Sequence, residues 1–148
     1  MPSKGKRAAA ELQAALKKYD DFISLTLKPN LKTVLDARDN TLSKLSDYQK
    51  LKTQIEMMQT HNLKELKTMV DLGSQFYVQA HVPDTTYIYV NVGFGFHVQF
   101  TLDEALAFIE KKEKRLESLA SEQASEADKI RAHIKMVLEA MSEILRSG

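Results

Sequence analysis

Apolar residues change their spacing twice along this sequence, from helical to strand-like and back to helical. Up to about residue 70, and again from residue 102, they recur every three or four positions, as on one face of an α-helix. Residues 71–101 instead are rich in β-branched and aromatic side chains and contain no Lys or Arg, a composition typical of strands. The pattern predicts an α+β fold with a small sheet between two long helices.

The first helix is predicted over residues 8–70, with one interruption. Pro29 should produce a kink or a new helix start, because a proline inside a helix removes a hydrogen bond and clashes with the preceding turn, at a cost of ~3 kcal/mol. After it, a coiled-coil seam runs from Leu31 to Met69, with polar residues such as Arg38 and Lys52 at several seam positions. Before it, apolar residues at spacings of four, three and four form a shorter stripe: Leu12, Leu16, Tyr19 and Ile23.

Two β-hairpins in tandem are predicted over residues 71–101. Pro83-Asp84-Thr85 marks one turn, since proline presets φ and aspartate closes a turn locally. Gly93-Phe94-Gly95 marks a second turn, where both glycines tolerate the left-handed conformation. The strands that flank these turns are expected near residues 69–72, 76–82, 86–92 and 96–100.

The second helix is predicted over residues 102–146. Thr101 and Glu104 form a capping-box pattern, in which the Thr hydroxyl bonds the amide three residues on and the Glu reaches back. The seam of this helix alternates by four and three from Leu102 to Ile144. Because a compact sheet joins the two helices, they must form an antiparallel coiled-coil hairpin with both β-hairpins at its closed end. Matching their rises, ~1.5 Å per residue, places residue 146 near residue 27, so that the segment before Pro29 either extends beyond the pair or folds separately.

The amino-acid composition excludes several kinds of binding site and membrane segment. The net charge is +1 and there is no Cys, so nothing indicates a nucleic-acid surface, and disulfides and thiolate metal sites are excluded. No apolar run approaches the ~18 residues of a membrane span, and the first residues lack a signal-peptide core. We expect one domain over residues 1–148 of an intracellular protein, with no direct contact to nucleic acid or membrane. Residues 1–7 are a basic tail, either simply solvated or a nuclear-import signal.

No constellation for catalysis stands out in the sequence. Gly93-x-Gly95 lacks the third glycine and the following helix of a dinucleotide-binding loop. No serine lies on a strained strand-to-helix turn that would present a nucleophile. The histidines are scattered over helices and strands, without a partner at metal-ligand spacing: His61, His81, His97 and His133. We therefore expect no enzyme activity and no catalytic, cofactor or metal site.

The strand-rich segment, residues 71–101, is not expected to be stable by itself, and this favours oligomerisation. Isolated hairpins are marginal in water, and their open edges are aggregation sites unless another strand pairs with them. Residues 71–101 are too few to form an independent core. The economical solution is that these strands join strands of other subunits in a barrel-like ring, so that the chain is an obligate subunit of a β-assembled oligomer.

This layout resembles that of the alpha-class prefoldin subunits, over about residues 12–145. Two hairpins favour the alpha class, because beta-class subunits have one. The sharpest likeness lies in Val70-Asp71-Leu72-Gly73, Val92-Gly93-Phe94-Gly95-Phe96 and Thr101-Leu102-Asp103-Glu104-Ala105. Further segments are similar to one prefoldin-like member of that class: Tyr19–Ser24, Val34–Asp39, Val82–Thr85, Ile88–Val90 and Ala132–Met136.

The resemblance implies a non-enzymatic co-chaperone subunit in a hetero-oligomeric complex that acts in protein folding, assembly of large complexes and transcription regulation. It implies as partners the beta-class prefoldin subunits, an unconventional prefoldin (URI), RuvB-like ATPases through the complex, unfolded or assembling client proteins, and transcription factors. The cytoplasm and nucleus are the expected locations. Two alternatives stay open: an alpha subunit of the general hexameric prefoldin that delivers unfolded clients to the cytosolic chaperonin, and a free-standing transcriptional adaptor.

Two sets of site residues follow from the resemblance. The β-hairpins are expected to mediate subunit assembly, and the alternative is that their aromatic residues only cover the chain's own helix ends. Clients are expected to contact apolar residues toward the open end of the helices, and the alternative is that these residues complete the seam. The assembly set is Phe76, Val78, Tyr87, Tyr89, Val92, Gly93, Phe94, Gly95, Phe96 and Val98. The client set is Leu12, Leu16, Tyr19, Ile23, Leu138, Met141 and Leu145.

Overall fold

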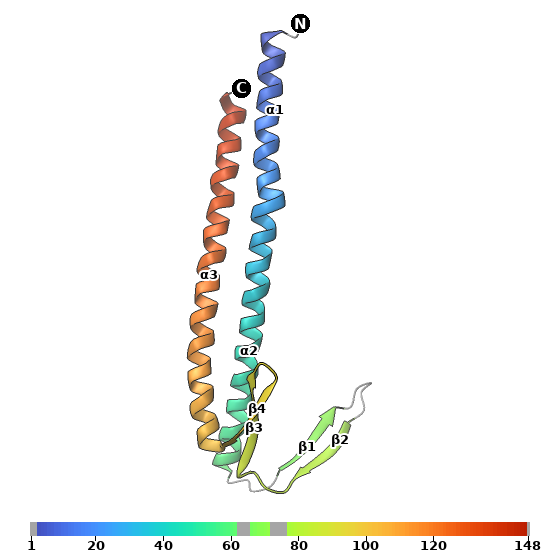
Figure 1. The fold of residues 1–148 in the computed structure, drawn as a ribbon, viewed down its shortest axis with the longest axis vertical. Helices are drawn as coiled ribbons and strands as arrows, with labels where there is room; N and C mark the ends of the chain where they lie inside the picture. Colours follow the sequence, from blue (N-terminus) through green and yellow to red (C-terminus); the bar gives the residue numbers. More distant parts are fainter. Residues whose placement is uncertain (1–2, 62–65, 72–76, 148) are drawn as a thin grey trace. The chain divides into compact units, whose positions relative to one another are not determined.

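A computed structural model describes residues 3–61, 66–71 and 77–147. The predicted α+β class, with two β-hairpins between long helices, is confirmed (Figure 1). In the ranges given above, no helix is both long and apolar enough to cross a membrane. The elements are, in chain order, α1 (Lys4–Phe22), the π-helical η1 (Ile23–Leu27), α2 (Lys28–Thr60), β1 (Leu66–Asp71), β2 (Tyr77–Val82), β3 (Tyr87–Gly93), β4 (Phe96–Thr101) and α3 (Leu102–Ser147).

The chain divides into two compact units. The terminal unit consists of Met1–Leu42 and Ser118–Gly148, and the hairpin unit consists of Ser43–Glu117. Helices α2 and α3 contribute to both units, because each crosses a boundary between them. Both β-hairpins belong to the hairpin unit.

In the hairpin unit, helix α2, helix α3 and the second β-hairpin share one apolar core. Its largest fully buried side chains are Ile55 of α2, Ile109 of α3 and Val90 of β3. Phe108 of α3 stacks on Phe100 of β4, with ring centroids 5.4 Å apart, and extends the core along the hairpin. The second hairpin is therefore held by both helices at once.

In the terminal unit, a second cluster joins the N-terminal helical segments to α3. Ile23, Leu27 and Val137 are buried, and Phe22 meets His133 edge-on with ring centroids 5.5 Å apart. Partly buried residues of α3 pack against this cluster: Ile130, Ile134 and Met141. Residue 27 thus lies opposite this stretch of α3, and the expected pairing of residue 27 with residue 146 is wrong. The part of the segment before Pro29 that includes Phe22, Ile23 and Leu27 packs against α3.

Residue 27 pairs with a different part of α3 than expected because α2 ends earlier than predicted. Helix α2 ends at Thr60, whereas the apolar spacing predicted a helix up to residue 70. Leu66–Asp71 instead form β1, which pairs antiparallel with β2 in a register from Leu66↔Val82 to Asp71↔Tyr77. The expected seam positions Leu66 and Met69 therefore lie in a strand, where pairing with β2 overrides a helical spacing of apolar residues.

The irregularity expected at Pro29 lies just before it, in η1. The Lys28 N–H donates to the Ile23 carbonyl, five residues back, while the backbone dihedrals of Phe22 and Lys28 on either side are right-handed helical. Pro29 itself occupies the first turn of α2, a position in which proline is tolerated. The N-terminal segment therefore passes through Pro29 without leaving the helical conformation.

Local polar contacts end the strands where the sequence predicted turns and caps. The Asp84 carboxylate accepts hydrogen bonds from the Thr86 hydroxyl at 2.6 Å and from the Thr86 N–H at 2.9 Å, and these two bonds lower the pKa of Asp84. The Thr101 hydroxyl accepts from the Glu104 N–H at 3.2 Å and donates to the Glu104 carboxylate at 2.9 Å. Helix α3 starts from this cap, with Asp103 and Glu104 in the first turn, where negative charge favours the helix dipole.

We predict that Ile55→Ala lowers the free energy of unfolding by about 2–5 kcal/mol, because it leaves a cavity in the core of the hairpin unit. Denaturant unfolding followed by circular dichroism measures this change. Met57→Ala on the same helix is the matched control: Met57 is exposed, so its truncation should change stability by no more than ~0.5 kcal/mol. Equal effects of the two substitutions would contradict the placement of this core.

Candidate functional site

The second β-hairpin presents its turn as an exposed aromatic tip. Gly93, Phe94 and Gly95 all have positive φ, at 103°, 54° and 78°. The left-handed conformation is easy for glycine and uncommon for phenylalanine, so the two glycines are what allow Phe94 to occupy the tip. Its side chain is 100% exposed.

One face of this hairpin continues beyond the chain's own core. Opposite residues pair as Ile88↔Phe100 and Val90↔Val98. Because side chains along a strand alternate between faces, Phe96 and Val98 share the face of Phe100, which packs on the helices. Yet Phe96 is 67% exposed and Val98 is 40% exposed. The apolar stripe of β4 therefore extends past the area that α2 and α3 cover.

Tyr48 of α2 fixes the hairpin at the point where its ladder is interrupted. The register shifts between Asn91 and Gly93, as in a β-bulge. The Tyr48 hydroxyl donates to the Asn91 carbonyl at 2.9 Å, and the Gly93 N–H donates to the Asn91 side-chain oxygen at 3.0 Å. Burial raises the pKa of Tyr48 above its ordinary value. The hydroxyl thus remains a donor over the physiological range and holds the bulge against α2.

The opposite face of the hairpin carries exposed tyrosines. Tyr87 and Tyr89 lie opposite Thr101 and Gln99, and both tyrosine side chains are exposed. More than half of the surface of each of these tyrosines, and of Phe94 and Phe96, is left exposed by the described residues. Their role in subunit assembly stays a prediction.

The remaining members of the expected assembly set are placed less uniformly. Val92 and Gly93 are half-buried, and Gly95 is exposed at the turn. Val78 lies in β2, opposite Val70. Phe76 lies outside the described residues. The second hairpin thus carries Phe96 and Val98 on one face, Tyr87 and Tyr89 on the other, and Phe94 at its turn. We call these five residues together the hairpin surface.

The residues expected to contact clients divide between the seam and the surface. Ile23 is 4% exposed and lies inside the terminal-unit cluster, with Met141 packed against it; Ile23 therefore completes the seam and is not an exposed contact. Leu12 and Leu16 are half-buried. The members of the set with exposed side chains are Tyr19, Leu138 and Leu145.

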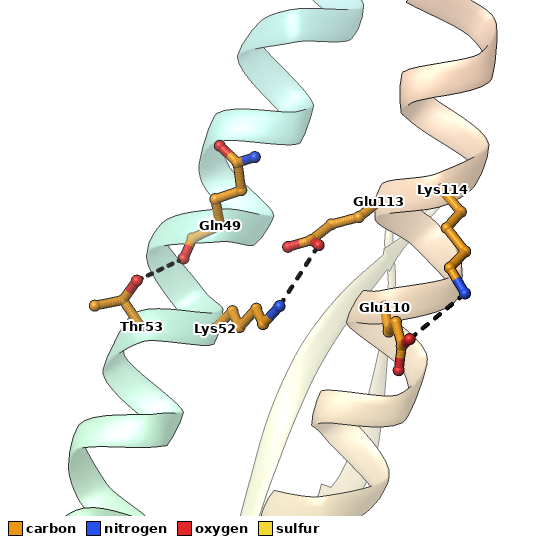
Figure 2. Close-up of polar contacts among 6 residues, drawn as sticks. All are labelled: Gln49, Lys52, Thr53, Glu110, Glu113 and Lys114. Carbon is orange, nitrogen blue, oxygen red and sulfur yellow. Dashed lines mark hydrogen bonds and ion pairs between the residues drawn. The ribbon is translucent and has the colours of Figure 1, made fainter.

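Polar seam residues pair across the two helices of the hairpin unit. The Lys52 ammonium lies 3.8 Å from the Glu113 carboxylate (Figure 2), and the Gln59 side-chain amide donates to Asp103 at 2.8 Å. The pairing of rising numbers on α2 with falling numbers on α3 shows that the helices are antiparallel here. By contrast, Lys114 and Glu110 form an exposed pair within α3 (Figure 2), a kind of contact that contributes little to stability. The sequence showed Lys52 and Glu113 as seam positions, but not as partners.

No group of three or more potential metal ligands gathers in the part of the chain that the structure describes. The features above are exposed aromatic and apolar side chains on a β-hairpin that packs on two helices. A family model described as Prefoldin subunit matches residues 27–147. The chain belongs to the prefoldin family. The chain is thus a prefoldin-like chaperone subunit, of a family that is chaperone-type and not enzymatic.

Curated relatives specify the branch of the prefoldin family. The chain is 41% identical to Protein UXT of Bos taurus over 145 residues, which cover 97% of this chain and 93% of that protein. It is 40% identical to Protein UXT of Homo sapiens, over 97% of this chain and 92% of that protein. A Protein UXT homolog of Nematostella vectensis is 40% identical over 90% of this chain and 86% of that protein. UXT is the prefoldin-like member that the sequence segments resembled, and the resemblance is confirmed.

The fold has a counterpart among solved structures. The cryo-EM structure of filamentous PFD from Methanocaldococcus jannaschii matches with a TM-score of 0.55 and 20% identity. The match covers 85% of this chain and 97% of that chain. At this identity, the likeness supports the prefoldin fold alone.

We predict that Tyr48→Phe lowers the free energy of unfolding by about 0.5–1.5 kcal/mol, because it removes the hydrogen bond to the Asn91 carbonyl. Since the folded state raises the pKa of Tyr48, the stabilisation by this group is complete below the unfolded value of ~10 and is lost as pH rises further. Denaturant unfolding should therefore show a stability difference between wild type and Tyr48→Phe that narrows above pH ~10. Tyr89→Phe, at an exposed tyrosine, is the control. An equal loss of unfolding free energy in that variant would contradict a stabilising role of the Tyr48 hydroxyl.

Proposed function

We propose that this chain is a non-enzymatic co-chaperone subunit that joins a hetero-oligomeric prefoldin-like complex through its hairpin surface. The observation that carries the proposal is the apolar stripe of β4, in which Phe100 is packed on the chain's own helices while Phe96 is 67% exposed. Exposed large apolar patches mark interaction sites in soluble proteins. A second chain that covers Phe96 and Val98 would extend a core that this chain begins.

The open edges of the sheet support the same proposal. Each described sheet has two strands, β1–β2 and β3–β4, so each strand has one edge without a ladder partner among the described strands. Unpaired strand edges invite pairing with another chain. Residues 71–101, which contain β2, β3 and β4, include no Lys or Arg, whereas β1 contains Lys67; Lys in particular is the residue that blunts exposed edges. Edge pairing and coverage of the apolar stripe would be achieved together by strands of a neighbouring subunit.

The proposed neighbours are other prefoldin subunits, beta-class members and the unconventional prefoldin URI among them. The identity of the curated relatives favours a UXT-like prefoldin complex over the general hexameric prefoldin. We further propose that such a complex works with RuvB-like ATPases on unfolded or assembling client proteins. Transcription regulation, with a location in both cytoplasm and nucleus, belongs to the same proposal.

We predict that Phe94→Asp combined with Phe96→Asp abolishes assembly, because two carboxylates would have to be desolvated at the interface. The measurement is an affinity pull-down of the tagged full-length chain from cells, with quantification of stoichiometric partners. Met57→Asp combined with Met136→Asp is the matched control, since both methionines are exposed on helices and far from the turn in sequence. A Phe94/Phe96 variant that retains its full set of partners would refute the assembly site.

The partners recovered by the wild-type chain decide between the complexes. An unconventional prefoldin and RuvB-like ATPases support the proposal as stated. General prefoldin subunits with the cytosolic chaperonin would replace it by the general hexameric complex. A wild-type chain that recovers no prefoldin partner would overturn the oligomeric subunit and favour the free-standing adaptor.

We predict that Leu138→Lys combined with Leu145→Lys weakens client holding without loss of assembly, because both side chains are exposed and neither belongs to the terminal-unit cluster. Light scattering of an aggregating denatured protein, in the presence of the purified complex, measures holding. Glu139→Gln with Glu143→Gln is the control, because it raises the net charge of the same helix by the same two units. An unchanged delay of aggregation in the leucine variant would remove these residues from the client set.

A further inference from the structure

The apolar seam of the N-terminal segment contains one residue too many. From Leu31 onward the seam positions alternate by three and four, starting with Leu31, Val34 and Arg38. Before it, the positions Tyr19, Ile23, Leu27 and Leu31 are separated by three steps of four residues. Regular alternation would require a step of three positions after Ile23, whereas Leu27 lies four positions after it. The surplus residue therefore falls between Ile23 and Leu27.

These two residues bound the one π-helical segment among the described residues. η1 runs from Ile23 to Leu27, and its wide turn is closed by the bond from the Lys28 N–H to the Ile23 carbonyl. Both end residues are buried against α3, at 4% and 5% exposure. Leu25, between them, is 75% exposed. The wide turn thus keeps both ends in the seam and turns the residues between them outward.

A regular α-helix over the same residues would not keep the apolar stripe before Ile23 facing α3. An α-helical residue advances by ~100°, so three steps of four residues advance by ~1,200°, or ~120° beyond three full turns. Such a rotation would carry the stripe before Ile23 away from α3. A π turn contains more residues for each turn and advances less for each residue. We propose that η1 absorbs a one-residue insertion in the coiled-coil seam and thereby keeps Leu12, Leu16 and Tyr19 in register with Leu31 and the rest of α2.

The alternative cause of the π-helical turn is Pro29. A proline cannot donate to the carbonyl four residues back, here that of Leu25, and its ring clashes with that group. A wide turn before the proline relieves the clash, but it does so whatever the spacing of the apolar residues. The coincidence of η1 with the surplus residue, and the burial of both Ile23 and Leu27, favour register as the cause. The two explanations of the π turn, seam register and Pro29, predict different results for variants of this helix.

Deletion of Leu25 tests the proposal in the full-length chain. It restores the alternation of four and three, so the variant should have a melting temperature equal to or above that of the wild type. Deletion of Asn40 is the matched control, because Asn40 is exposed in the regular part of α2 and its loss rotates the preceding helix by ~100° relative to the rest. That control should melt about 5 °C lower or more. A Leu25 deletion that destabilises the chain as much as the Asn40 deletion would overturn the proposal.

A cysteine pair reports the register itself, independently of stability. The chain has no Cys, and Phe22 contacts His133, so Phe22→Cys with His133→Cys provides one cross-linking site for a short bifunctional reagent. The cross-link should form in the full-length chain and in the Leu25 deletion, and its yield should fall in the Asn40 deletion. Pro29→Ala should retain both the cross-link and the π turn, seen by NMR or crystallography. A regular α-helix from Ile23 to Leu27 in Pro29→Ala would assign the turn to proline and refute the register proposal.

Discussion

Burial of one face of a two-stranded hairpin is the constraint on which the rest of the hairpin unit depends. A β-hairpin of this size is marginal by itself, and neither α2 nor α3 can bury its apolar stripe alone. The three elements meet in one buried cluster that contains Ile55, Val90 and Ile109. Each element supplies the apolar surface that the others need. The Tyr48 bond to Asn91 then orients the hairpin on this cluster.

The same constraint leaves an imbalance that gives the surface its character. The helices cover the half of the hairpin near Ile88 and Phe100, but not the half that bears Phe96 and the Phe94 tip. The strand must nevertheless continue to the turn, because Gly93 and Gly95 are the residues that permit the positive φ values there. The apolar stripe of β4 is therefore covered by the helices at Phe100 and exposed at Phe96. For this reason the exposed aromatic residues continue directly from the packed ones.

The elements with the strongest local signals were predictable from the sequence. The capping pattern of Thr101 and Glu104 located the start of α3, and the two glycines around Phe94 located the second turn, because both depend on short-range chemistry. The end of α2 was not predictable in the same way. Leu66 and Met69 continue a helical spacing, and only the ladder with β2 makes them part of a strand. The exposure of Phe96 and the burial of Ile23 also depend on which partner surface is present, which spacing alone does not contain.

Polar residues inside the seam show why register carries so much of this fold. Lys52 and Glu113 can pair only if α2 and α3 are aligned to within one turn, and a slip would leave both charges partly buried and unpaired, which is costly. Polar seam residues carry a cost in both units, since Glu113 Oε1, Arg38 Nε and Gln123 Oε1 are buried and have no hydrogen-bond partner among the described residues. A seam that holds such groups at fixed positions has little tolerance for rotation of the adjoining helix. An extra residue between Ile23 and Leu27 is therefore accommodated where the seam is apolar on both sides, before the polar positions begin at Arg38.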